Sequence, residues 1–265
     1  MDEKVVAVGF CCADVYEKLG VFYPTGNGID WGVHLSRMGV DVSAVSVVGT
    51  DEYGRRMREA LSAEGIDVSH LRQEPGDTCV MLMDLRNGTD RVHLEEVEGV
   101  MADYALTPEE DAFVRTHDML HTDLFGNVLD HLHGWHEAGM EVVMDFSTFS
   151  EDPDYHCEDI FPDVDHVFMS YDKDDQHIRD WIRHVQGFGP KTVCATLGEL
   201  GSLCYDGERT YECGIVPAEV VNTVGAGDSY IAGFTYGLLN GWDIPACMRK
   251  GSEVSSQVIQ KFEPY

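Results

Sequence analysis

The chain has 265 residues, of which 43% are hydrophobic and 10% aromatic, enough for one large domain with a substantial core. Acidic residues dominate its charge, since 48 Asp and Glu stand against 18 Lys and Arg, for a formal net charge of −30. Such a surface repels phosphate backbones and anionic lipid headgroups, which argues against nucleic-acid binding and membrane docking. We expect a single globular domain over residues 1–265.

The sequence also carries signals of cellular location. No apolar run approaches the roughly 20 residues that span a bilayer, and the first residues lack the features of a secretory signal peptide. None of the eight cysteines forms a C-x-x-C pair, and four of them lie in apolar runs: Cys11, Cys79, Cys194 and Cys204. Buried thiols in a reducing compartment fit this pattern better than disulfides do. We expect a cytoplasmic protein.

Apolar segments rich in β-branched residues alternate with longer segments of helical periodicity. The predicted strands are residues 5–10, 42–49, 119–125, 141–146, 166–170 and 192–198. The predicted helices are residues 27–39, 53–65, 126–138 and 172–186. This alternation predicts an α/β fold in which helices cover both faces of a parallel sheet through right-handed crossovers.

Two predicted β-hairpins interrupt this alternation. Residues 78–97 contain two strand-like runs around Asn87-Gly88, a strong turn signal, and residues 203–212 turn at an Asp-Gly pair. Because a doubly wound fold has no place for either hairpin among its parallel strands, each is expected to project from the main sheet or to border it. The first hairpin is expected to form a protruding flap.

The most informative motif is the glycine-rich segment VNTVGAGDSYIAGF at 221–234. Gly225, Ala226 and Gly227 form a compact turn, after which Asp228 opens a helix of small residues. Glycine amides at a helix N-terminus can approach and bind an anion. The carboxylate beside them has two interpretations: it caps the helix, or it takes the proton of an alcohol that attacks a phosphoryl group.

Other turns are predicted to meet this motif at one edge of the sheet. TGNG at 25–28 opens the first long helix, Asp14 follows the first strand, and TLGELGS at 196–202 forms another glycine turn after a strand. Ligands of open α/β sheets bind beyond the carboxyl ends of the strands. The combination favours a phosphotransferase over a structural coincidence, with the 196–202 turn suited to nucleotide phosphates or ribose.

These motifs resemble the ribokinase-like (PfkB) carbohydrate kinases over essentially the whole chain. The resemblance rests on Asp14, TGN at 25–27, VVGTDEYG at 47–54, the TLGELGS turn and GAGD at 225–228. It implies a three-layer α/β/α sandwich with a small β-hairpin lid, formed by segments 11–24 and 77–98. It also implies phosphorylation of a sugar hydroxyl with ATP and Mg²⁺.

Within the family, the fructoselysine 6-kinases are the most similar group. This narrower resemblance rests on DRVHLEEVEGVMADYAL at 90–106, HTDLFG at 121–126 and the shortness of the chain. It implies phosphorylation of the primary hydroxyl of a ketose or ketoamine, with fructoselysine as substrate and its 6-phosphate as product. Fructokinase, ribokinase and nucleoside kinase activities are alternatives, as is a non-catalytic sugar or nucleotide sensor. The presence of Asp228 argues against the sensor.

The family resemblance implies roles for individual residues. Asp228 would be the catalytic base, and the amides of Gly225, Ala226 and Gly227 would bind the transferring phosphoryl group. The residues expected to bind the nucleotide are Thr196, Gly198 and Gly201. The residues expected to bind the sugar are Asp14, Gly26 and Asn27, and the place of Arg91 in the return strand of the flap makes it a further candidate. Mg²⁺ would bridge the ATP phosphates, with no protein ligand assigned to it.

The sequence departs from the family pattern at several positions. Thr25 replaces a glycine before the substrate asparagine, and Asp30 replaces a second asparagine. Asn222 stands where the signature begins with aspartate, which leaves activation by a monovalent cation open. The Asn-x-x-Glu motif is replaced by SYDKDD at 170–175. Either the aspartates of this segment assist the metal, or they form a solvated helix start.

Four histidines and an arginine are weaker candidates. His131, His133 and His136 cluster in sequence, but they share a helical face only in part, which disfavours a metal site. His121 follows a strand toward the ligand edge, where it either contacts substrate or is an ordinary strand-end histidine. Arg91 either hydrogen bonds to substrate or discourages aggregation at an edge strand.

The flap and the acidic charge lead to two further predictions. The flap carries Val80, Leu82 and Val92, which need a partner surface, so it is expected to form the contact of a homodimer. Its glutamates in segment 95–98 are placed to meet an amine that extends from the sugar, and the acidic surface would steer such a cation inward. The alternative is that the charge serves solubility alone.

Overall fold

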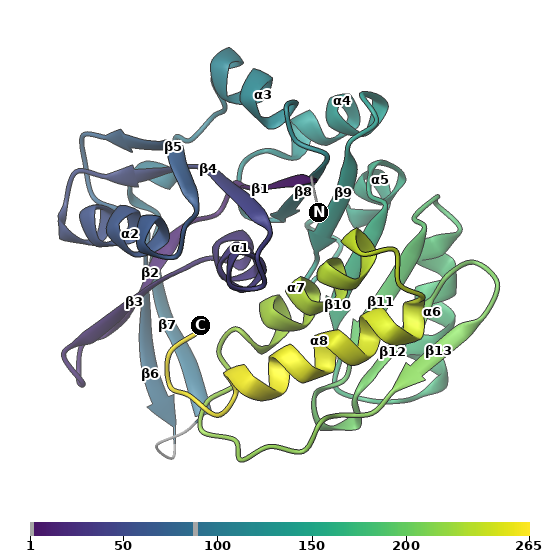
Figure 1. The fold of residues 1–265 in the computed structure, drawn as a ribbon. Helices are drawn as coiled ribbons and strands as arrows, with labels where there is room; N and C mark the ends of the chain where they lie inside the picture. Colours follow the sequence, from purple (N-terminus) through teal and green to yellow (C-terminus); the bar gives the residue numbers. More distant parts are fainter. Residues whose placement is uncertain (1–2, 87–89) are drawn as a thin grey trace.

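A nine-stranded main sheet runs through the centre of the molecule (Figure 1). The computed structural model describes residues 3–86 and 90–265, without the side chains of Asp90 and Arg91. From one edge to the other, the strands are β13 (Thr210–Cys213), β12 (Ser202–Tyr205), β11 (Thr192–Thr196), β10 (His166–Ser170), β9 (Glu141–Asp145), β8 (Met119–Asp123), β1 (Lys4–Val8), β4 (Asp41–Gly49) and β5 (Asp67–Glu74).

The main sheet is parallel except at one edge. From β11 to β5 every neighbouring pair is parallel. The β12–β13 hairpin pairs antiparallel to β11 and borders the sheet, as the sequence predicted for residues 203–212. Because both faces of the parallel part are covered, its strands are continuous apolar segments, such as the buried run at 5–8.

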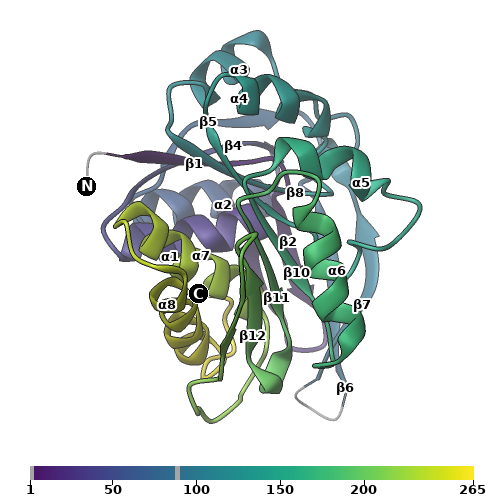
Figure 2. The same ribbon diagram turned by 90° about the vertical axis from the view of Figure 1, so that its right-hand side faces the viewer.

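Helices cover both faces of the main sheet (Figure 2). The helices on one face are α1 (Asn27–Arg37), α2 (Glu52–Ala63), α7 (Ala226–Leu239) and α8 (Ile244–Val258). The helices on the other face are α3 (Pro108–Val114), α4 (Leu132–Glu137), α5 (Cys157–Ile160) and α6 (Gln176–Gln186). Trp31 and Phe234 are buried in the first core, and Trp135 and Ile182 in the second. The prediction of a three-layer α/β/α sandwich is therefore confirmed.

A second sheet, which we call the small sheet, lies beyond the carboxyl end of β1. Its strands in spatial order are β3 (Val21–Thr25), β2 (Cys12–Tyr16), β6 (Val80–Arg86) and β7 (Asp90–Val97). The pair β2–β6 is parallel, and the pairs β2–β3 and β6–β7 are antiparallel. The predicted flap strands are thus present, but they belong to a sheet of four strands, because β2 offers its free edge to β6. The predicted Asn87-Gly88 turn lies outside the described residues.

Two predicted helices start later than the sequence suggested. The predicted helix 126–138 is reduced to α4, because the backbone turns at Asn127 with a φ of 55° and a short 3₁₀ segment precedes the helix. The predicted helix 172–186 begins only after Asp175, whose side chain accepts a hydrogen bond from an amide of the first turn. Short 3₁₀ segments lie at Gly99–Met101, Leu129–His131, Phe161–Asp163 and Gly198–Leu200.

The cysteines are free thiols. All are buried except Cys213, which is half-buried. Burial of the four thiols that lie in apolar runs, Cys11, Cys79, Cys194 and Cys204, is as predicted. Across residues 3–86 and 90–265, no helix is both long enough and apolar enough to cross a bilayer.

Candidate active site

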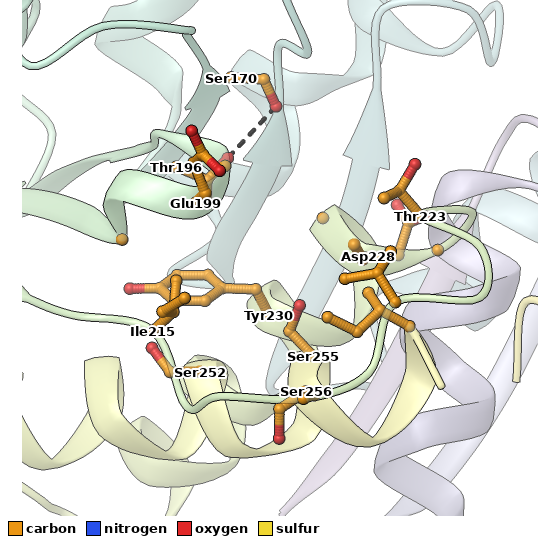
Figure 3. Close-up of a pocket in the computed structure, with 18 of the residues that line it drawn as sticks. Ser170, Thr196, Glu199, Ile215, Thr223, Asp228, Tyr230, Ser252, Ser255 and Ser256 are labelled. Atoms are coloured by element: carbon orange, nitrogen blue, oxygen red, sulfur yellow. Dashed lines mark hydrogen bonds between the residues drawn. The ribbon is translucent and has the colours of Figure 1, made fainter. Parts of the chain in front are cut away.

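A cavity of about 770 Å³ opens at the carboxyl ends of β9, β10 and β11, beside the first turns of α1 and α7. The residues from the sequence analysis that line it are Asn27, Thr196, Gly198, Gly201, Gly225, Ala226, Gly227 and Asp228. Figure 3 shows Asp228 and Tyr230 of α7 on one wall, with the serines of α8 beside them. Segments from both halves of the chain therefore meet in one cavity.

Asp228 lies half-buried in the first turn of α7, at the cavity wall. The N-cap of α7 is Gly225, whose backbone is left-handed with a φ of 69°. The interpretation of Asp228 as the N-cap of this helix is therefore wrong. Its carboxylate shares the cavity with the glycine-rich turn, an arrangement suited to phosphoryl transfer to an alcohol.

Gly225 and Gly227 are glycines for different reasons. A Cβ atom on Gly225 would come within 2.6 Å of the carbonyl oxygen of Pro264, so packing and the left-handed backbone both exclude a side chain there. Gly227 has a helical backbone, and apart from its two neighbours and the nearby backbone of its own helix, a Cβ atom on it would meet no described atom within 4 Å. Because Gly227 lines the cavity, its missing side chain leaves room for a ligand.

The other end of the cavity combines a glycine turn with an apolar wall. Thr196 ends β11, and its hydroxyl lies 3.3 Å from that of Ser170 (Figure 3). Ile215 and Val220, on the loop after β13, line the cavity with side chains that are 52% and 56% exposed. Exposed apolar side chains in a cavity suit the face of a flat ring. The sequence analysis missed this wall, because loop 214–221 has no regular periodicity.

Two predicted residues, Gly26 and Asp14, do not line this cavity, and a third has a side chain that the structure does not describe. Gly26 is the N-cap of α1, directly before the cavity-lining asparagine. Asp14 is buried in β2, paired with Tyr23 of β3 and with Met81 of β6. The side chain of Arg91 lies outside the described part of the chain. Substrate roles for these three residues stay predictions.

Comparison with known proteins identifies the family. The profile of the pfkB family carbohydrate kinases matches residues 3–134 and 160–265. The chain belongs to this family. This kinase is 32% identical to fructoselysine 6-kinases of Shigella flexneri and Escherichia coli (strain K12), over 97% of this chain and 98% of each relative. It is 31% identical to a fructosamine kinase of Bacillus subtilis, over 96% of this chain and 90% of the relative.

Solved structures confirm the ribokinase-like fold. Arabidopsis thaliana ribokinase complexed with ribose and ATP superposes with a TM-score of 0.85 at 19% identity, covering 99% of this chain and 94% of the ribokinase. Adenosine kinase of Sinorhizobium meliloti superposes with a TM-score of 0.83 at 18% identity, covering 100% of this chain and 96% of the other. The protein is a carbohydrate kinase, and membership of this kinase family implies the use of ATP.

The structure gives a local reason for one departure of this kinase from the family pattern. Asn222 is buried, and its Nδ2 donates a hydrogen bond to the carbonyl oxygen of Phe262 at 3.0 Å. Its Oδ1 accepts a hydrogen bond from the Val224 amide at 3.1 Å. Aspartate could keep the second bond, but it would place an oxygen with no proton against the Phe262 carbonyl. The buried amide therefore favours asparagine at this position.

Two further positions that depart from the family pattern, Thr25 and Asp30, hydrogen bond to each other. The hydroxyl of Thr25 donates a hydrogen bond to Oδ2 of Asp30 at 2.8 Å, and both side chains are buried. Asp30 lies in the first turn of α1, where the helix dipole favours a negative charge. Glycine in place of Thr25 would remove this donor from the Asp30 carboxylate. The two replacements therefore form one local unit beside Asn27.

Two aspartates that the sequence analysis did not select lie at neighbouring strand ends. Asp123 ends β8, Asp145 ends β9, and the two are paired in register. Asp145 lines the cavity and accepts hydrogen bonds from Nδ2 of Asn27 at 3.3 Å and from the Ser147 amide at 2.8 Å. Burial, with a smaller contribution from the charge of Asp145, raises the pKa of Asp123 to about 7. Burial raises the pKa of Asp145 to about 6.

A sequence signal for these two aspartates was available. Each is a charged residue that closes an apolar strand, in MLHTD and EVVMD, and the carboxyl ends of parallel strands meet at the ligand edge. The sequence prediction applied this rule to Asp14, to His121 and to the glycine turns, but not to the last residues of these two strands. Asp123 and Asp145 are therefore residues that strand-end reasoning could have selected, although their pairing required the strand order.

The aspartates of segment 170–175 have structural contacts or lie at the surface. Asp174 pairs with Arg179 at 2.7 Å, Asp175 caps α6, and Asp172 is exposed. Within residues 3–86 and 90–265, no group of three or more His, Cys, Asp and Glu side chains could hold a metal ion. The contacts of Asp174 and Asp175 favour the interpretation of this segment as a solvated helix start.

The histidine candidates occupy structural positions in this kinase. His121 is fully buried and stacks on Trp31 of α1, with ring centroids 5.0 Å apart. Burial lowers the pKa of His121 to about 3, so its ring is neutral at physiological pH. In the cluster at 131–136, His133 pairs with Asp163 at 2.9 Å on the surface. These contacts give the histidines roles in the core and on the surface, away from the cavity.

Proposed function

We propose that this kinase transfers the γ-phosphoryl group of ATP to the 6-hydroxyl of a ketoamine, with fructoselysine as its substrate. The observation that carries the proposal is the chain-long similarity, at 31% to 32% identity, to two fructoselysine 6-kinases and a fructosamine kinase. The cavity adds support, because Asp228, the glycine turn and Asn27 all line it. A cytoplasmic location, where ATP is available, is part of the proposal.

Asp228 would act as the general base. Its carboxylate takes the proton of the sugar hydroxyl while the hydroxyl oxygen forms a bond to the γ-phosphorus. The bond between the γ-phosphorus and the β,γ-bridging oxygen breaks, so the products are the sugar 6-phosphate and ADP. The amides of Gly225, Ala226 and Gly227 would stabilise the negative charge on the transferring group.

The remaining predicted residues would position the two substrates. Those proposed to bind the sugar are Asp14, Gly26, Asn27 and Arg91. Those proposed to bind the nucleotide are Thr196, Gly198 and Gly201, with Ile215 and Val220 against the adenine ring. The nucleotide substrate would be MgATP, its metal held by phosphate and water oxygens, since the described residues offer no ligand set of their own.

A coupled ATP-consumption assay tests the proposal over fructoselysine, other fructosamines, fructose, ribose and adenosine. We expect the highest kcat/KM for a ketoamine. A higher value for fructose, ribose or adenosine would replace the proposal with a fructokinase, ribokinase or nucleoside kinase. Binding of a sugar without turnover of any of them would favour the non-catalytic sensor.

The substitution Asp228→Asn tests the base. We expect kcat to fall by roughly 10²- to 10⁴-fold, because asparagine cannot take the proton. Thermal unfolding is expected to be unchanged, because Gly225 caps α7. The matched control is Asp243→Asn, which changes the N-cap of α8 to another good cap outside the cavity and should keep full activity. Turnover of Asp228→Asn within a few-fold of the parent would show that the base is assigned wrongly.

A further inference from the structure

Two buried carboxylates lie side by side at the ends of β8 and β9: Asp145 lines the active-site cavity, and Asp123 is buried directly beside it. Asp123 is 1% exposed and Asp145 9% exposed, and the parallel register of β8 and β9 places them directly opposite each other. Asp145 lines the cavity together with Asn27 and Asp228. The pair therefore belongs to the same site as the proposed base, but the transfer of the phosphoryl group does not use it.

Only neutral groups donate hydrogen bonds to this pair among the described residues. The Phe125 amide donates to Asp123 at 2.8 Å, and the Ser147 amide and the Asn27 side chain donate to Asp145 at 2.8 and 3.3 Å. No basic side chain of the described chain forms an ion pair with either aspartate or influences its pKa. Burying two carboxylates with no cation beside them costs free energy, because their charges lose the stabilisation that water gives. A cationic group of a ligand would recover part of this free energy and would therefore bind strongly at this wall.

We propose that the Asp123–Asp145 pair binds the protonated amine of a ketoamine substrate. This inference rests on the proposed function. When the 6-hydroxyl of the sugar lies at Asp228, the amine on C1 is at the opposite end of the sugar, and Asn27 contacts Asp145 along the same wall. A neutral sugar such as fructose brings no cation to the pair, so the pair selects for ketoamines and against simple ketoses.

The pair also predicts a specific pH dependence. The pKa of Asp123 is about 7 and that of Asp145 about 6, so both carboxylates gain protons as the pH falls through this range. A protonated pair no longer attracts the ammonium group, so the KM for fructoselysine should rise steeply between about pH 8 and about pH 5.5. The KM for fructose should change little over the same range.

Other groups around the pair do not produce this difference between the two sugars. His121, on the same strand as Asp123, stays neutral because burial lowers its pKa to about 3. Phe168 of β10, which pairs with Asp145, is apolar, and α1 contributes the neutral Asn27 amide. Asp228 of α7 lines the same cavity, but it is the proposed base for both sugars, so its contribution is common to both.

The variants Asp123→Asn and Asp145→Asn test the pair. We expect the ratio of kcat/KM for fructoselysine to that for fructose to fall by roughly 10- to 100-fold, the effect of losing a hydrogen bond between charged groups. The matched control is Asp165→Asn. Asp165 is also a buried carboxylate, but it accepts a hydrogen bond from the Val142 amide near the start of β9, at the opposite end of that strand. This control should leave the ratio unchanged.

The outcomes separate the inference from the proposed function. If the parent prefers fructoselysine and both variants keep that preference, the amine assignment is overturned while the proposed function stands. If the parent phosphorylates fructose better than any fructosamine, the proposed function fails and the inference fails with it. The inference can also be tested on the parent alone, by measuring its affinity for fructoselysine by calorimetry. An affinity that does not change between about pH 8 and about pH 5.5 would overturn the inference.

Discussion

At the scale of single residues, the positions that depart from the family pattern are explained by direct neighbours. Thr25 and Asp30 hydrogen bond to each other, and Asn222 uses both ends of its amide on buried backbone groups. A change at one of these positions would leave a buried donor or acceptor without its partner, which costs about 1–3 kcal/mol. The departures are therefore local rearrangements that leave the neighbouring cavity intact.

Gly227→Ala separates a role in binding from a role in folding. Beyond its two neighbours and the nearby backbone of its own helix, the new Cβ would meet no described atom within 4 Å, and alanine favours a helix over glycine by about 1 kcal/mol. The melting temperature should therefore hold or rise. The methyl group would intrude where the transferring phosphoryl group is proposed to bind, so kcat and ATP affinity should fall by at least about tenfold. Steady-state kinetics and thermal unfolding of the same sample measure both effects.

The neighbouring glycine provides the comparison for this variant. Gly225→Ala places a side chain at a left-handed position and within 2.6 Å of the Pro264 carbonyl oxygen, so it should destabilise the fold as well as lower activity. Full activity of Gly227→Ala would mean that no ligand group comes close to this amide, and the proposed anion site would then have to be moved.

At the scale of elements, the C-terminal segment joins the small sheet to the active-site turn. The ring of Phe262 packs against those of Tyr16 and Tyr23, with centroids 5.3 and 5.8 Å away, while its carbonyl oxygen accepts the bond from Asn222. Pro264 lies against Gly225. Through these contacts, the position of the small sheet and the position of the glycine turn depend on the same few residues.

The small sheet is expected to form a homodimer contact. Its outer strand β7 exposes Leu94 by 60% and Val97 by 45%, and an edge strand with exposed apolar residues gains from pairing with a second copy. Light scattering at micromolar concentration should give a dimer mass, and Leu94→Glu should shift the protein toward monomer. Trp242→Glu, at an exposed apolar residue between α7 and α8, is the control and should leave the mass unchanged. A fully active monomeric parent would rule this contact out.

At the scale of the whole molecule, the net charge of −30 predicts how salt affects the two kinds of substrate. A ketoamine with two amines and one carboxylate approaches as a cation, and the acidic protein attracts it at long range. Raising the ionic strength from about 0.1 M to about 1 M shortens the screening length from about 10 Å to about 3 Å. The kcat/KM for fructoselysine should therefore fall with salt, while that for neutral fructose stays flat.

Fructose serves as the internal control for this measurement, because any general effect of salt on the enzyme or on MgATP acts on both sugars. The glutamates at 95, 96 and 98 are exposed on or beside β7 and add to the field near the small sheet. Parallel salt curves for the two sugars would leave the acidic surface as a feature of solubility alone.

The sequence by itself determined the layers of the fold and one end of the active site. Apolar β-branched runs and helical periodicity are local patterns, so they predicted the parallel sheet and most of its helices. The glycine turn and Asp228 are adjacent in sequence, and a helix that begins there places them together whatever surrounds it. These features depend on the conformation of a few consecutive residues, which local sequence can specify.

Only the tertiary structure decided which distant residues meet. The pairing of Asp123 with Asp145 depends on the order and register of β8 and β9, and Asn222 meets Phe262 only because the chain returns to the turn after α8. The four strands of the small sheet likewise combine segments on either side of α1, β4, α2 and β5. A periodic sequence pattern shows which face of a helix or strand is buried, but it does not show which other element covers that face. The contact partners of Asp123, Asn222 and the small-sheet strands depend on this arrangement of elements, so only the tertiary structure reveals them.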